Sequence, residues 1–224
     1  STPDAIALCT NKLSTYQHLS RHDIGCIETV ALSDYLKLNR DDYVIKPIDG
    51  LGCELTQRLQ GRTAIEAFIS QTPDPENFIV QGFTGGQAAS LSCLFRQGQG
   101  WLISCNHQDI DHQQQGFKLK GCLVNVASPY QDFYQALINQ IARAIPELWG
   151  YIGIDLIETP DHGPLVLEIN PRFTSSYAGI QAATGIRVTD QLLRLLTTEP
   201  DLTPLRQHTI YASIHGELLS CNTL

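Results

Sequence analysis

The chain has 224 residues, of which 42% are apolar and 17% are charged, and its formal net charge at pH 7 is −8. These fractions are typical of a folded globular protein with one large or two small domains. The acidic balance argues against a nucleic-acid partner, because no basic stripe is present to release counterions. No apolar run approaches 18 residues and no signal peptide opens the chain, so we expect no membrane partner.

Seven cysteines occur in the chain, and no two of them form a CxxC pair. The simplest interpretation is a set of reduced, mostly buried thiols in a cytoplasmic protein. A monomer and a homodimer are both compatible with this composition.

The first forty residues predict helices separated by an extended segment. The expected elements are a helix over 11–21, an extended segment over 24–31 and a helix over 33–38. We expect Ser33 to cap the second helix. Lys12 lies at the start of the first helix, where a surface charge is the simplest interpretation.

A strand that ends in a lysine is predicted over Tyr43–Pro47, and the loop after it contains Gly50 and Gly52. Backbone N–H groups of such a loop can hold a polyphosphate together with the Lys46 ammonium. The loop is not a Walker A motif, because GxxxxGK[ST] is absent. A plain hairpin loop explains the two glycines about as well. A helix is expected over 62–70.

An apolar strand over 78–81 breaks at Gly82–Gly86, and a second strand follows over 88–95. A connection of this kind can present backbone groups to the edge of an adenine ring. A hairpin turn between two adjacent strands is an equally good interpretation.

Two further strands are predicted over 101–106 and 116–126, with a linker of mixed histidines and aspartates over 107–115. The linker matches no common zinc spacing, so we expect a solvated hairpin loop. Lys118 and Lys120 lie on one face of the second strand, facing either phosphate or water.

Helical spacing of apolar residues predicts a helix over 131–145, followed after the next hairpin by helices over 178–184 and 189–196. The first would bury Phe133, Leu137 and Ile141, and the last would bury Leu193 and Leu196 among other leucines. A strand over 209–214 closes the pattern, which is α+β.

The stretch Tyr151–Arg172 predicts a β-hairpin, because two apolar runs flank the turn residues Pro160–Gly163. A four-residue loop pairs Thr159 with Pro164, so that the numbers of facing residues sum to 323. The register then places Asp155 opposite Glu168 and Gly153 opposite Asn170, with these polar side chains on one face. The other face would pair Ile154 with Ile169 and Leu156 with Leu167 in the core.

Facing carboxylates on neighbouring strands repel each other, so a cation lies between Asp155 and Glu168 or one of them holds a proton. Two carboxylates and the Asn170 carboxamide oxygen suit Mg²⁺ better than Zn²⁺, and Mg²⁺ commonly brings phosphate oxygens with it. An exposed polar face on an ordinary hairpin is the alternative. A slip of one residue in register would break the pairing.

These motifs resemble the ATP-grasp superfamily. Lys12, the VIKP segment at 44–47, the Phe78–Phe95 strand pair and the segment GIDLIETPDHGPLVLEINPR at 153–172 come in the order expected of ATP-dependent carboxylate–amine ligases. The segments VQGFTGGQAASLSCLF, LISCNHQDI and EINPRFTSSYAGI look most like the archaeal tyramine–glutamate ligase group, whose relatives belong to C1-carrier cofactor pathways.

The resemblance implies a role for each motif residue. Lys12 and Lys46 would hold the ATP phosphates, and the Asp49–Cys53 loop would close over them. Arg172, with Lys46, would face the transferring phosphoryl group or the acceptor carboxylate. The backbone of Val80, Gln81, Gly82 and Phe83, with the Gln81 side chain, would bind the adenine. Asp155, Glu168 and Asn170 would be the ligands of Mg²⁺ (or Mn²⁺).

The resemblance also implies an architecture of two α+β subdomains that clasp the nucleotide. We expect a linker region over 1–40, a small subdomain over 41–95 and a larger one over 96–224. Family members carry an α/β domain before the Lys12 helix, and we expect it to be absent here. Many members also have a carboxylate at Gln81 and another near Gln87–Ala88 for the ribose, where this chain has amide or apolar side chains.

The expected activity is ATP-dependent formation of an amide from a small carboxylate and an amine, through an acyl phosphate. Glutamate with an amine is the pair that the resemblance suggests. One alternative is a degenerate nucleotide-binding module without turnover. The other is a bicarbonate-dependent carboxylase of the same fold.

Overall fold

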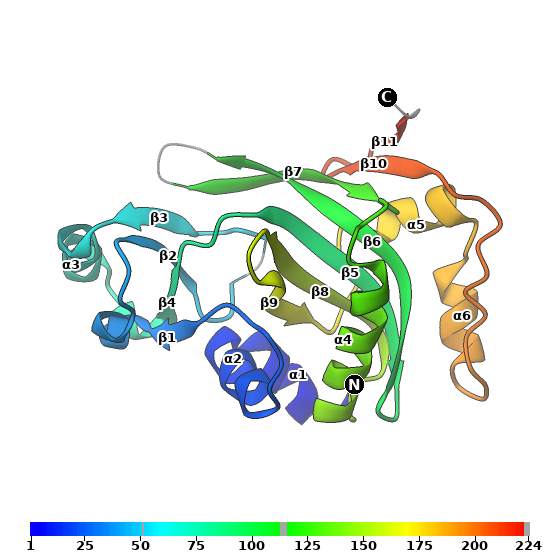
Figure 1. The fold of residues 1–224 in the computed structure, drawn as a ribbon, viewed down its shortest axis with the longest axis horizontal. Helices are drawn as coiled ribbons and strands as arrows, with labels where there is room; N and C mark the ends of the chain where they lie inside the picture. The colour runs from blue at the N-terminus through cyan, green and yellow to red at the C-terminus, as the bar shows by residue number, and fades with distance from the viewer. Residues whose placement is uncertain (51, 113–115, 222–224) are drawn as a thin grey trace.

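Two antiparallel sheets organise the computed structural model, which describes residues 1–50, 52–112 and 116–221 (Figure 1). The small sheet runs, from edge to edge, β1 (Thr29–Ala31), β4 (Phe78–Gly82), β2 (Asp42–Pro47) and β3 (Gln57–Gln60). The large sheet runs β11 (Leu218–Cys221), β10 (Thr209–Ser213), β7 (Phe117–Val124), β6 (Gln99–His112), β5 (Gln87–Arg96), β8 (Gly150–Thr159) and β9 (Gly163–Asn170).

The small sheet buries one face and leaves the other for a ligand. Tyr43 and Ile45 on β2 alternate with Val44 and Lys46, as strand geometry requires. The first pair lies in a core with Ile65 and residues of the short helical segments. The helical elements that cover this face are α3 (Arg62–Gln71) and the 3-10 segments η1 (Leu32–Lys37) and η2 (Pro75–Asn77).

The large sheet has a separate core on each face. On one face Leu137 and Ile141 of α4 pack against the central strands, together with residues of the two N-terminal helices. On the other face Ile180 and Leu195 lie in a core with residues of β5, β6, β7, β8 and β10. The helices are α1 (Pro3–Thr10), α2 (Lys12–Arg21), α4 (Gln131–Ala144), α5 (Tyr177–Thr184) and α6 (Val188–Arg194).

Most expected helices form, but some of their buried faces differ from prediction. The segment after Ala31 is a 3-10 helix that begins at Leu32, and Ser33 makes no capping bond. In α4 the buried side carries Tyr134 and Ile138, while Phe133 is 46% exposed. Leu193 of α6 is 68% exposed. Helix α1 was not predicted.

The expected linker over 107–115 is wrong for its first six residues, which continue β6 to His112. Gln113–Gln115 lie outside the described residues. Phe117 and Leu119 of β7 line the cavity described below, so Lys118, between them, faces away from it. Lys120 pairs with Asp111 at 3.3 Å.

The connection over Gly82–Gly86 is a crossover between the two sheets and not a hairpin, because β4 and β5 belong to different sheets. Gly86 has φ +155°, and a Cβ there would lie 2.4 Å from the Glu158 carbonyl oxygen. A residue without a side chain is therefore needed where the crossover meets β8.

The remaining expectations concern thiols and membrane spans. All seven cysteines are free thiols, in agreement with the interpretation of a reduced protein. In the part of the chain that the structure describes, no helix combines the length and apolar character needed to cross a membrane.

Candidate active site

The β8–β9 hairpin places the predicted polar residues opposite one another. Gly153 pairs with Asn170, and Asp155 pairs with Glu168, as the sequence predicts. A Cβ at Gly153 would lie 2.4 Å from Thr174 Cγ2, so only glycine lets the following loop cross the hairpin here.

The register nearer the turn is wrong by one residue. Thr159 pairs with Gly163 and Leu156 with Val166, because the loop has three residues and not four. A bulge at Leu167 restores the predicted register before Glu168 is reached. Leu167 therefore lines the cavity, whereas the prediction placed it in the core.

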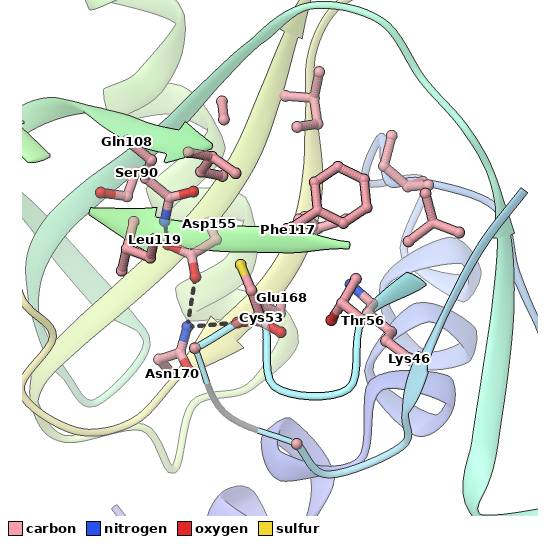
Figure 2. Close-up of a pocket in the computed structure, with 18 of the residues that line it drawn as sticks. Lys46, Cys53, Thr56, Ser90, Gln108, Phe117, Leu119, Asp155, Glu168 and Asn170 are labelled. Atoms are coloured by element: carbon pink, nitrogen blue, oxygen red, sulfur yellow. Dashed lines mark hydrogen bonds between the residues drawn. The ribbon is translucent and has the colours of Figure 1, made fainter. Parts of the chain in front are cut away.

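A cavity of about 700 Å³ lies between the two sheets, and both charged and apolar side chains line it. Figure 2 shows residues of the small sheet and of the large sheet pointing into it from opposite sides. The lining includes the charged or polar residues Lys12, Lys46, Asp155, Glu168, Asn170 and Arg172. It also includes the apolar residues Ile27, Val44, Phe83, Ala88, Ile157 and Leu167.

The pKa values of the two facing carboxylates are shifted in opposite directions. Burial raises the pKa of Asp155 well above its usual range, and the adjacent Glu168 carboxylate adds to this effect. Burial also opposes ionisation of Glu168, but Lys46, Lys12 and neighbouring hydrogen bonds together hold its pKa below the ordinary value. A proton on Asp155 therefore relieves the repulsion that the pairing creates.

Two lysines face this pair. Lys12 Nζ donates to the Gly50 carbonyl oxygen at 2.6 Å and lies 3.5 Å from Glu168 Oε2. Lys12 is only 7% exposed, so the surface interpretation of this residue is wrong. Lys46 is equally buried, and burial lowers the pKa of its ammonium while Glu168 opposes the shift.

Asn170 connects the carboxylates to Arg172. Its Nδ2 donates to Asp155 Oδ2 at 3.0 Å and to Glu168 Oε1 at 3.4 Å (Figure 2). Its Oδ1 accepts from Arg172 Nη2 at 2.9 Å. For Oδ1 to become a metal ligand the amide has to turn over, which ends the hydrogen bond to Arg172.

The donor set fits a hard divalent cation that is completed by other oxygens. Asp155 and Glu168 offer two carboxylates on one face, and Asn170 offers a carboxamide. Within the described ranges, no cluster of three or more His, Cys, Asp or Glu forms a complete metal site. Mg²⁺ is commonly held by one or two carboxylates with substrate phosphates and water.

Some of the other residues expected to bind the nucleotide line the cavity, and others do not. Asp49 and Val80 are absent from the cavity lining, and the Val80 side chain lies in the core of the small sheet. The part of the expected loop at Leu51 lies outside the described residues. The expected residues that line the cavity are Gly50, Gly52, Gln81, Gly82 and Phe83.

Two contributions to the site were missed by the sequence reasoning. Gln108 Nε2 donates to Asp155 Oδ1 at 2.9 Å, from a position that was assigned to a loop. The alternation of side chains along His107-Gln108-Asp109-Ile110 was the sequence signal that could have indicated a strand here. Arg58, whose guanidinium lies 3.5 Å above the Phe83 ring, was also missed.

A ring of four hydroxyls anchors the loop that follows Arg172. Ser92 accepts from Tyr151 at 2.9 Å and from Asn106 at 3.1 Å, so its own proton is donated to Ser176. Ser176 in turn lies 3.0 Å from Thr174, and Thr174 lies 3.1 Å from Tyr151, which closes the ring. Each hydroxyl then donates once within the ring.

We expect Tyr151→Phe to destabilise the fold by about 1–3 kcal/mol, because it leaves buried ring members without a partner. Urea unfolding measures the change. Tyr177→Phe is the matched control, since no hydrogen bond of the Tyr177 hydroxyl occurs among the described residues. Equal effects of the two changes would show that the ring does not stabilise the loop.

Two sheets that close on a cavity, with buried lysines facing paired carboxylates, define a clasp for an anionic ligand with a cation. The chain belongs to the ATP-grasp family, because the ATP-grasp domain matches residues 9–176. The expected ATP-grasp fold of two α+β subdomains is confirmed by this match and by similar solved structures.

A tyramine–L-glutamate ligase from Methanocaldococcus fervens is 28% identical over 163 residues, which cover 70% of this chain and 47% of the relative. The L-amino acid ligase from Bacillus licheniformis has a TM-score of 0.74 at 18% identity, over 92% of this chain and 54% of that one. The chain spans about half the length of the curated relatives it matches.

The biotin carboxylase domain of 2-oxoglutarate carboxylase from Hydrogenobacter thermophilus was solved with MgADP, ADP and bicarbonate. Its TM-score is 0.76 at 11% identity, and the match covers 93% of this chain and 50% of that chain. At this identity the likeness concerns the fold alone.

Proposed function

We propose that the chain is the ATP-grasp unit of an ATP-dependent carboxylate–amine ligase. The observation that carries the proposal is the Asp155–Glu168 pair, which faces the buried Lys46 across the cavity. Lys12 and Lys46 partly balance Glu168, but burying these charged groups together is costly. A nucleotide polyphosphate bound with Mg²⁺ or Mn²⁺ would give the lysines an anion and the carboxylates a cation.

The chemistry has two steps. A carboxylate oxygen of the first substrate attacks the γ-phosphorus of ATP, the bond to the β-phosphate oxygen breaks, and an acyl phosphate and ADP form. The amine nitrogen then attacks the acyl carbon, phosphate leaves, and the nitrogen loses a proton to give the amide. The divalent cation, when bound, neutralises charge on the phosphate oxygens.

The residues of the chain hold and orient the reactants. Lys12 and Lys46 bind phosphate oxygens, and Asp155, Glu168 and Asn170 hold the cation. Arg172 is exposed at the cavity lining and carries a fork suited to phosphoryl or carboxylate oxygens. No paired nucleophile and base is required, because positioning and charge stabilisation do most of the work in phosphoryl transfer.

The first substrates to test are glutamate and primary amines. Their choice follows the printed name of the tyramine–L-glutamate ligase relative and the sequence resemblance to that group. A place in a C1-carrier cofactor pathway belongs to the same proposal.

The test is ADP release by the chain with Mg²⁺, screened over amino acids paired with amines. We expect ADP to appear only when both substrates are present, with one amide formed per ADP. Release that requires bicarbonate instead would favour the carboxylase alternative, to which the fold of the Hydrogenobacter domain points. ATP binding without ADP release under any combination would favour the non-catalytic module. That alternative is included because Gln81 stands where many family members have a carboxylate.

A further inference from the structure

Apolar side chains at one end of the cavity determine where a nucleotide base would lie; this inference rests on the proposed function. Val44 precedes Lys46 by two residues on the cavity face of β2, and Ile157 follows Asp155 by two residues on the cavity face of β8. The crossover over 82–86 joins these two places, since a Cβ at Gly86 would lie 2.7 Å from Ile157 Cγ2. A polyphosphate bound by the lysines therefore directs its base to this apolar end.

Gln81 is the polar residue of the small sheet at this place. It lies on the central strand β4, with Thr29 of β1 and Val44 of β2 as its two cross-strand neighbours. Its side chain is only 2% exposed and lines the cavity. A buried amide at the apolar end of a ligand cavity has to direct its hydrogen-bonding groups at defined partners.

The hydrogen bonds around Thr29 fix which way the amide points. The Thr29 hydroxyl donates to the Ile27 carbonyl oxygen at 2.9 Å, and that oxygen can only accept. Thr29 Oγ1 is left to accept, and it does so from Gln81 Nε2 at 2.8 Å. While the Thr29 proton stays on that bond, turning the amide over would place Gln81 Oε1 against an oxygen with no proton left to donate.

The other end of the amide is open to a ligand. Gln81 Oε1 has no hydrogen-bond partner among the described residues. In the described ranges, His107 Nε2 is the one fully buried side-chain nitrogen or oxygen without a hydrogen-bond partner. Gln81 Oε1 is therefore not fully buried. Gln81 therefore presents a hydrogen-bond acceptor, Oε1, to the cavity, because its NH₂ group is bonded to Thr29.

We propose that Thr29 is a positioning residue that makes Gln81 select purine bases with an amino group at position 6. Adenine presents a 6-amino donor to Gln81 Oε1. Hypoxanthine and guanine present a 6-oxo acceptor at the same place, which Oε1 repels. Selection therefore comes from the Ile27–Thr29–Gln81 chain of hydrogen bonds, although Thr29 itself does not touch the base.

The experiment measures dissociation constants of MgATP and MgITP for the 224-residue chain by calorimetry, because ITP differs from ATP at the purine 6 position. We expect the unmodified chain to prefer ATP by about tenfold or more, the value of one well-placed hydrogen bond. In Thr29→Val the amide is free to turn and donate to the 6-oxo group. We expect the two constants to come within about threefold of each other in that variant.

Thr29→Ser is the matched control, because it keeps the hydroxyl and should restore the preference for ATP. Equal binding of ATP and ITP by the unmodified chain would overturn the inference while leaving the proposed function in place. A Thr29→Val chain that keeps the full preference would overturn the role of Thr29. Failure to bind either nucleotide would overturn the proposed function and this inference with it.

Discussion

Glu168→Gln is expected to reduce ADP formation by roughly 10²–10³-fold or more, the scale for removing one electrostatic stabilising group. Glu168 is the ionised member of the facing pair, because Lys46 and Lys12 help to hold its pKa low against burial. The amide removes this charge and, with it, part of the repulsion that raises the pKa of Asp155. A cation would then meet one carboxyl group at this place instead of a facing pair.

The matched control for this change is Asp161→Asn, which removes one charge from the exposed turn of the same hairpin. Steady-state ADP formation at saturating Mg²⁺ measures both variants. Asp161→Asn should retain activity. Full turnover by Glu168→Gln would rule out the carboxylate pair as the metal-binding part of a ligase.

Lys46→Met is expected to weaken MgATP binding by roughly 10–150-fold, the value of one hydrogen bond to a charged group. Its stability should change little, because burial already disfavours the Lys46 ammonium and lowers its pKa, and Lys12 remains 3.5 Å from Glu168 Oε2. We therefore expect the substitution to change ATP binding, measured by calorimetry, but not thermal unfolding, measured without nucleotide. Loss of binding with an unchanged melting temperature is the expected pattern.

Lys37→Met serves as the control for charge and side-chain length. Lys37 is exposed on η1, where it pairs with Asp34 at 2.8 Å, away from the cavity lining. We expect its ATP affinity to equal that of the unmodified chain. If Lys46→Met bound MgATP as tightly as Lys37→Met, the phosphates would not lie where the buried lysines place them.

The central part of the site could be predicted because it depends on local pairing. One hairpin sets Asp155 against Glu168, and strand alternation places Asn170 on the same face. The predicted pairing of Asp155 with Glu168 was correct, but the reasoning behind it was incomplete. The loop is one residue shorter than expected, and the bulge at Leu167 compensates, which alternation alone does not reveal.

The missed features depend on contacts between distant segments. Lys12 was predicted at the site by the resemblance alone, because its burial depends on the contact between helix α2 and the Gly50 carbonyl oxygen. The strand identity of Gln108 was hidden by polar neighbours that are typical of loops, although β6 carries it to Asp155. The crossover at Gly82–Gly86 resembles a hairpin turn locally, and only the division into two sheets distinguishes it.

Cocrystallisation of the chain with Mg²⁺ and a non-hydrolysable ATP analogue is the most direct measurement. We expect the ion between Asp155 and Glu168, bridged to phosphate oxygens that Lys46 contacts, with the base between Val44 and Ile157. A nucleotide bound outside this cavity, or an ion held away from both hairpin carboxylates, would contradict the assignment.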